Sequence, residues 1–256
     1  MTRPARLRPP RRIRAGAAGN RDSGARLSCA VLATGPEEWA AVDLESGAFV
    51  RARPSMLARV AETPWSLFDV ALVTIGIEDE PPDPARSEGV PLAEVPQPVG
   101  RMRRRGARRL LSRLAVPEQR WRALLGTHGP SVAYVDLDVS APSIALVTVA
   151  AKSLRCFIRD DGLPYCSFTW GGTEQALPLL DARVVAPLRT SGLGLDGQLL
   201  AAAVGGKPGY LVVGLGAVRA GHAPKVVLSV VARRPRPDGR ANAITPPVSP
   251  EAVTPD

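Results

Sequence analysis

The sequence predicts a mainly β protein of the β-rich α+β class, and three observations lead to that prediction. Short apolar runs rich in Val, Leu and Ile recur along the chain. Glycine, proline and aspartate separate these runs at short intervals, as tight turns between strands require. Little helical periodicity lies between them. We expect an antiparallel meander closed as a barrel or sandwich in the second half, a smaller β unit in the first half, and a basic helical connector between them.

Shifts in composition divide the chain into five parts. They are an Arg- and Pro-rich arm (1–26), a small β unit (27–100) with an acidic Pro-rich loop (78–91), a basic helical connector (101–125), an antiparallel β domain (126–234) and a Pro-rich tail (235–256). The arm and the tail have no apolar periodicity, so they cannot bury enough surface to offset the entropy of ordering. We expect both to be disordered.

In the first half, the apolar run 27–34 predicts a strand. Segment 39–53 has two extended halves on either side of Gly47, a residue that tolerates the positive φ of a hairpin turn. Segment 68–76 is rich in Val and Ile and predicts a further strand. The spacing of apolar residues among arginines predicts a helix over 101–115, which ends before Pro117.

The second half has the clearer β pattern. Strands are predicted over 131–139, 143–151, 182–186, 209–216 and 225–233. Segment 154–170 is expected to form a hairpin that turns at Asp160-Asp161-Gly162, and the pair Gly171-Gly172 predicts a second tight hairpin with the residues that follow. A short helix is expected from Asp196, acting as its N-cap, to about Val204, with Gly205 ending it.

The net charge of +9 is concentrated in two places. Eight arginines lie in 1–26 and nine in 101–122, whereas the body of the chain is net acidic. Clustered arginines neutralise phosphates and release counterions, which indicates binding to nucleic acid or to another polyanion. The candidate polyanion-binding residues are Arg103, Arg104, Arg105, Arg108, Arg109, Arg120, Trp121 and Arg122.

Two other interpretations of these arginines stay open. The chain has only three lysines among its 33 basic residues, a bias that a GC-rich coding sequence would also produce. Alternatively, the acidic residues of 78–88 could pair with the basic helix within the molecule. In that case the arginines would serve the fold.

A catalytic interpretation depends on few residues. Asp136 and Asp138 alternate along an expected strand and would share one face, with His222 as a third acid/base candidate. Residues 190–197 contain a G-x-G-x-x-G pattern at Gly192, Gly194 and Gly197. The pattern lacks the immediate strand, the long helix and the distant carboxylate of a dinucleotide site, so we interpret it as turn chemistry.

The remaining observations exclude several classes of site. Two histidines and three cysteines without C-x-x-C spacing predict no metal, and no cofactor is expected. Cys156 and Cys166 could face each other across a hairpin, and we expect two buried thiols there. No apolar stretch is long enough for a membrane span. The expected location is cytoplasmic, and the oligomeric state stays open.

The sequence therefore favours a non-catalytic binding or adaptor protein. Its Arg-rich arm and connector would contact nucleic acid, the ribosome or an acidic protein partner. The alternative is a small-molecule-binding β domain or enzyme with a site near the 190–197 loop and the 217–224 turn.

Overall fold

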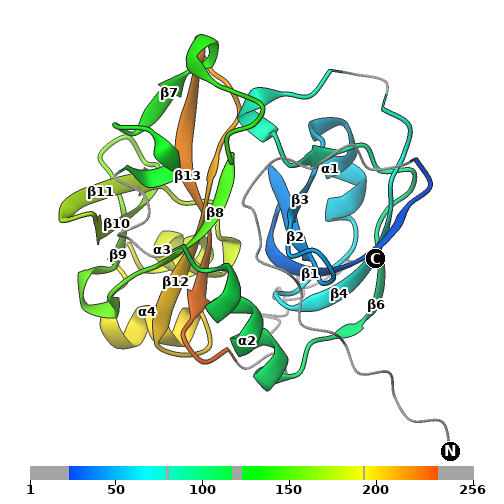
Figure 1. Ribbon diagram of the computed structural model, residues 1–256. Coiled ribbons are helices and arrows are strands. Elements are labelled where there is room, and N and C mark those ends of the chain that lie inside the picture. The colour runs from blue at the N-terminus through cyan, green and yellow to red at the C-terminus, as the bar shows by residue number, and fades with distance from the viewer. Residues whose placement is uncertain (1–22, 79–80, 117–122, 193, 236–256) are drawn as a thin grey trace, which may run out of the picture.

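The computed structural model describes residues 23–78, 81–116, 123–192 and 194–235, and most of its regular structure is β (Figure 1). The strands are β1 (Arg26–Gly35), β2 (Glu38–Asp43), β3 (Phe49–Ala52), β4 (Asp69–Thr74), β5 (Gly89–Val90), β6 (Gln97–Arg101), β7 (Ser131–Ala133), β8 (Ile144–Thr148), β9 (Arg155–Ile158), β10 (Pro164–Trp170), β11 (Thr173–Pro178), β12 (Pro208–Leu215) and β13 (His222–Ala232). The α-helices are α1 (Pro54–Ala61), α2 (Arg104–Leu114), α3 (Ala182–Ser191) and α4 (Gly197–Ala203). Short 3-10 turns are η1 (Pro84–Arg86), η3 (Leu124–Gly126), η4 (Tyr134–Asp136) and η5 (Ala151–Ser153). The predicted mainly β, antiparallel fold is confirmed.

The first half forms a six-stranded sheet with the order β5-β3-β2-β1-β4-β6. All neighbours are antiparallel except β3 and β5, which are parallel. The β2–β3 hairpin turns where the sequence predicts, because the Asp43 carboxylate accepts hydrogen bonds from the N–H groups of Glu45 and Ser46. Gly47 adopts a φ of 76° there, a conformation that residues with a Cβ rarely take.

Both faces of this sheet are covered. On one face, α1 packs Leu57 and Val60 against a cluster that includes Trp39 and Val31. Pro54 suits the first position of α1, where its missing N–H costs no hydrogen bond. The other face packs against the second half of the molecule. The central strands β1 and β2 are therefore covered on both faces, whereas the edge strand β6 is exposed (Figure 1).

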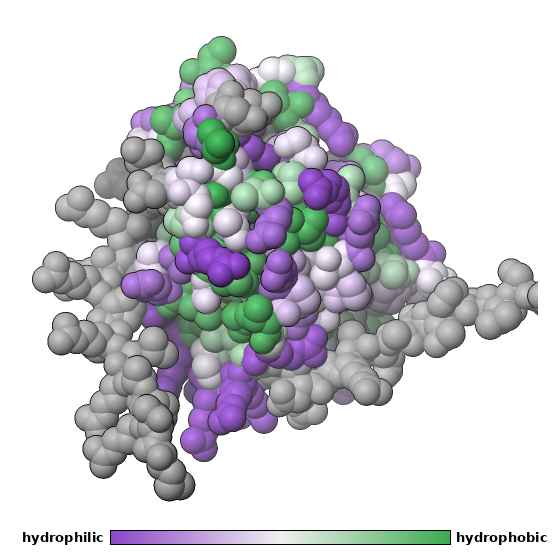
Figure 2. Space-filling view, turned by 90° about the vertical axis from the view of Figure 1, so that its right-hand side faces the viewer, coloured by the Kyte–Doolittle hydropathy of each residue, from purple (hydrophilic) through white to green (hydrophobic). Residues whose placement is uncertain are grey.

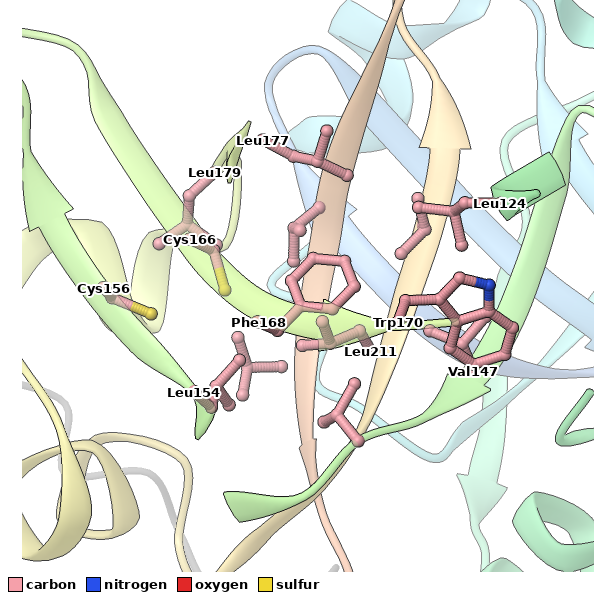
Figure 3. Close-up of a cluster of buried hydrophobic side chains, with 14 of the residues drawn as sticks. Leu124, Val147, Leu154, Cys156, Cys166, Phe168, Trp170, Leu177, Leu179 and Leu211 are labelled. Carbon is pink, nitrogen blue, oxygen red and sulfur yellow. The ribbon is translucent and has the colours of Figure 1, made fainter. Parts of the chain in front are cut away.

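The second half contains two antiparallel sheets, a four-stranded one with the order β7-β13-β12-β8 and a three-stranded one with the order β11-β10-β9. They face each other across an apolar core to which Phe168, Trp170 and Leu211 contribute (Figure 3). Helices α3 and α4 add Leu188 and Leu200 to the same core. The second half is thus a β-sandwich with two helices at its side.

The four-stranded sheet is buried on both faces, and this joins the two halves. Along β12, Leu211 and Val213 belong to the sandwich core, whereas Val212 belongs to a second cluster shared with the first half. That shared cluster contains Leu32 of β1 and Leu111 of α2. Strands covered on both faces need near-continuous apolar sequence, which explains the runs seen in β12 and β13.

Two predicted strands are wrong or shortened. Segment 182–186 is the start of α3, because Asp181 accepts a hydrogen bond from the N–H of Arg183 and caps a helix that buries Val184 and Leu188 one turn apart. The strand expected over 131–139 ends at Ala133, and the chain continues into η4.

Figure 2 shows the outward side of the first half, where hydrophilic and hydrophobic residues are interspersed. Among the described residues, no helix is both long and apolar enough to cross a bilayer.

Candidate nucleic-acid interface

Helix α2 carries the strongest charge feature of the described chain. Its sequence RRGARRLLSRL has no acidic residue. Ala107, Leu110, Leu111 and Leu114 lie on one side and are buried in the cluster shared by the two halves. The helix forms where predicted because these spacings place the apolar residues on one face.

Backbone hydrogen bonds hold both ends of α2. The N–H of Met102, just before the helix, donates to the carbonyl oxygen of Phe68 in the first half at 2.9 Å. The N–H of Val116, just after it, donates to the carbonyl oxygen of Leu146 in β8 at 2.8 Å. The helix therefore spans the joint between the halves as a fixed element (Figure 1).

The other face of α2 is covered with guanidinium groups. All six of these arginines are exposed: Arg103, Arg104, Arg105, Arg108, Arg109 and Arg113. Within the part of the chain that the structure describes, none of them forms an ion pair. Arg101, in the preceding strand, differs because its Nε lies 2.6 Å from Oδ1 of Asp69. We call the six residues the arginine face.

The arginine face is electrostatically unfavourable for the isolated helix. Arg104 and Arg105 lie at the positive end of the helix dipole, where cations are disfavoured. Arg104 and Arg108 form a like-charge pair four residues apart, as do Arg105 and Arg109. Each such pair destabilises a helix by a few tenths of a kcal/mol. The buried leucines offset this repulsion, and a bound polyanion would remove it.

Three further exposed cations, Lys207, Arg233 and Arg234, lie where β12 begins and β13 ends. The same strand ends contribute Tyr210 and Val231 to the cluster that contains the leucines of α2. These three cations therefore lie at strand ends that share a buried cluster with α2.

The acidic loop residues that the structure describes do not neutralise α2. Glu78 pairs with Arg53 beside α1. Asp83 caps η1 through its carboxylate. Glu88 is buried and accepts hydrogen bonds from the N–H and hydroxyl of Ser143. Among the described residues, the expected alternative of an acidic loop pairing with the basic helix is thus contradicted, because these carboxylates have partners elsewhere.

A second charged cluster is fully buried between the halves. Arg51, in β3, is 0% exposed and pairs with Glu38. Its guanidinium also donates to Oγ of Ser143 at 3.1 Å and to the carbonyl oxygen of Leu215 at 2.9 Å, both in the second half. Burial lowers the pKa of Arg51, but the carboxylates of Glu38 and Glu88 reverse this and leave it above its ordinary value. This arginine is a structural link between the halves.

The three predicted acid/base residues, Asp136, Asp138 and His222, all lie on the surface at one end of the second half. Asp136 and Asp138 follow Ala133 outside the strand, and both are exposed. Asp138 accepts hydrogen bonds from the N–H and hydroxyl of Ser140, which lower its pKa. His222 pairs with Ala133 at the start of β13 and is exposed at the same end of the molecule.

The glycine pattern ends one helix and precedes another. Gly192 ends α3 with a φ of 64°, and Gly205 follows α4 with a φ of 73°. Asp196 is at the N-cap position of α4, but its side chain accepts no capping hydrogen bond. Helix α4 leads into β12, whereas the 217–224 turn connects the end of β12 to β13. The 190–197 loop instead contacts β9, through the bridge between Leu195 and Cys156.

One part of the glycine loop lines a cavity. Gly194, Leu195 and Asp196 border a hollow of about 730 Å³ on the outer face of the three-stranded sheet. Its other lining residues include both charges, with Lys152 and Arg155 as cations and Glu174 as an anion. A second hollow of about 490 Å³ lies beside the N-terminus of α1. Asp136, Asp138 and His222 line neither of them.

Several predicted residues lie outside the described part of the chain. They are Arg120, Trp121 and Arg122 of the connector, Asp79 and Glu80 of the acidic loop, the arm up to residue 22 and the tail from residue 236. In the described part, no three His, Cys, Asp or Glu residues gather in a way that could hold a metal ion.

Fold and site together define a β-rich protein with a fixed basic helix between two packed β units. Comparison of the chain with protein-family models, with curated proteins and with solved structures gave no match. The function must therefore be inferred from the positions, burial and charges of the residues.

Proposed function

We propose that this protein is a non-catalytic nucleic-acid-binding protein that holds the phosphate backbone with the arginine face of α2. The observation that carries the proposal is a row of exposed guanidinium groups without carboxylate partners among the described residues, on a helix whose other face is buried. Arginine forms bidentate hydrogen bonds to phosphate, so such a row is suited to successive phosphate groups.

The dimensions of the arginine face fit a nucleic-acid strand. From Arg104 to Arg113 the helix rises about 14 Å at 1.5 Å per residue. That length corresponds to roughly four nucleotide steps of 3.4 Å along one strand. Lys207 and Arg233 would extend the contact beyond the helix.

The chemistry of the face favours nucleic acid over an acidic protein. Protein–protein interfaces have apolar cores in which aromatic residues and methionine are enriched. On α2 the exposed side chains are the arginines and Ser112, and none of the exposed large hydrophobic residues lies on this helix.

The test compares two triple variants with equal loss of charge. One replaces Arg104, Arg108 and Arg109 by glutamine, and the control replaces Arg59, Arg189 and Arg219, which are exposed on other surfaces. Anisotropy of a labelled duplex is measured across a salt series with full-length protein. We expect the α2 variant to bind at least tenfold more weakly and to have a salt slope smaller by about 0.9 for each phosphate that the variant no longer neutralises.

The control variant should retain most of the wild-type affinity. Equal weakening of both variants would mean that net charge alone attracts the duplex, and this would overturn the assignment to α2. If neither wild type nor variants bind at low salt, the proposed function is wrong, and the 730 Å³ hollow beside Gly194 becomes the candidate site.

A further inference from the structure

Cys156 in β9 and Cys166 in β10 lie directly opposite each other in the antiparallel register. Both are free thiols, and both are 0% exposed. They belong to the sandwich core, whereas Cys29 belongs to a different cluster on the first-half sheet. The two thiols therefore have each other, and not Cys29, as a potential covalent partner.

Backbone hydrogen bonds define how close this pair is. The N–H of Cys156 donates to the carbonyl oxygen of Leu195 at 2.8 Å, and the N–H of Leu195 donates to the carbonyl oxygen of Cys156 at 2.7 Å. Since the N–H and C=O of a strand residue point to the same side, neither of these groups of Cys156 points toward β10. Cys156 and Cys166 are consequently a non-hydrogen-bonded pair, the type with the shorter Cα separation, about 4.5 Å.

That separation falls within the range of about 4.4–6.8 Å that a disulfide spans. Figure 3 shows both sulfur atoms turned into the same core. The neighbouring Cys156 side chain, together with burial, raises the pKa of the Cys166 thiol well above its usual value. The strands thus place the two thiols opposite each other before any reaction.

We infer that Cys156 and Cys166 form a reversible oxidation site, at which hydrogen peroxide converts the dithiol into an intramolecular disulfide that ties β9 to β10. The thiolate of Cys156 attacks one peroxide oxygen, the O–O bond breaks, and the product is a sulfenic acid and water after proton uptake. The sulfur of Cys166 then attacks the sulfenic sulfur, the S–S bond forms, and hydroxide leaves as a second water. Two thiols and one peroxide yield one disulfide and two waters.

A small oxidant would reach Cys156 through local opening of the β9 edge, since the thiol is 0% exposed and faces the core. On the side away from β10, only Leu195 pairs with the backbone of Cys156, and this contact is an isolated bridge outside the named strands. Cys156 and Leu195 also line the 730 Å³ hollow. Release of two hydrogen bonds there would uncover the β9 edge without unfolding the sandwich, the kind of local opening that isolated contacts permit.

The experiment uses the wild-type full-length chain under native conditions. The protein is treated with hydrogen peroxide, remaining thiols are alkylated, and the intact mass and the disulfide-linked peptides are measured. We expect one disulfide joining Cys156 to Cys166, an unmodified Cys29, a yield independent of protein concentration, and full reversal by dithiothreitol. The melting temperature should rise by several degrees, because the crosslink restricts the unfolded chain.

The Cys29→Ser variant, which keeps both opposed thiols, should form the same crosslink, and Cys166→Ser should not. Three alkylatable thiols after exposure to excess peroxide, overoxidation without a crosslink, or a crosslink that includes Cys29 would each overturn the inference. This result does not depend on nucleic-acid binding, so either proposal can fail alone.

Discussion

Arginine has two opposite uses in this protein. Arg51 is 0% exposed, with a carboxylate and several oxygen acceptors around its guanidinium. The arginines of α2 face solvent and lack ion-pair partners among the described residues. Both groups lie close to the joint between the two halves. Since the residue type is the same in both places, the role of each arginine follows from the groups that surround it.

Lys225 lies between these extremes. It is 1% exposed, yet the acceptor described for its Nζ is the carbonyl oxygen of Thr127, at 2.5 Å. Burial lowers its pKa to about 8 because no nearby carboxylate compensates. The three environments therefore range from a fully paired buried cation, through a weakly paired one, to a solvent-exposed row. Each makes a different prediction.

Removal of the buried guanidinium should have the largest effect. Arg51→Ala leaves the carboxylate of Glu38 buried and without its main partner, a change that costs about 3–5 kcal/mol in proteins. Urea denaturation should show this loss in the free energy of unfolding. Equal stability of Arg51→Ala and wild type would show that the network does not link the halves.

The buried lysine predicts a pH-dependent stability. In the unfolded chain its pKa is the ordinary 10.5, and in the folded chain it is about 8. Between these values the unfolded state binds one more proton, so stability rises with pH through this window. The penalty is fully present below pH 8 and amounts to roughly 3 kcal/mol. The measurement is the unfolding free energy from pH 7 to 10.5, with Lys225→Met as the control.

In that comparison the wild type should gain stability relative to Lys225→Met as the pH rises. Parallel curves would contradict a depressed pKa.

The exposed arginines should matter least for stability. Replacing Arg104, Arg108 and Arg109 by glutamine should change the free energy of unfolding by less than about 0.5 kcal/mol, because solvent-exposed substitutions away from special contacts have small effects. The like-charge repulsion along α2 makes a slight gain the expected direction. If urea denaturation showed a loss of several kcal/mol in the free energy of unfolding, these side chains would stabilise the fold, and their assignment to binding would be weakened.

The sequence predicted those elements whose turn residues and apolar spacing lie within one short segment of the chain. Gly47 and the Gly171-Gly172 pair marked real hairpins. The leucines of α2 marked a real helix face. Helix α3 was missed although its signals are present, since Asp181 caps it and Gly192 ends it, because its Val-rich start resembled a strand.

Contacts between segments that are distant in the sequence had no comparable pattern of residues from which they could be predicted. Strand β7 pairs with β13 some 90 residues later, so no local turn residue could predict it. Arg51 looks like any arginine in the sequence, and its burial follows from Ser143 and Leu215 reaching it from the other half. The Cys156–Cys166 pairing was foreseeable in outline, since a ten-residue hairpin brings them together, but its hydrogen-bond type depends on Leu195.

By itself, the sequence determined the β-rich class, the tight hairpins and the amphipathic basic helix, because periodicity and turn chemistry act over a few residues. Tertiary structure alone decided that the two halves share a core, that Glu88 of the acidic loop bonds to Ser143, and that two cysteines lie opposite each other on neighbouring strands. The physical reason is that burial and pairing depend on which distant surfaces come together, and local propensity contains no information about that choice.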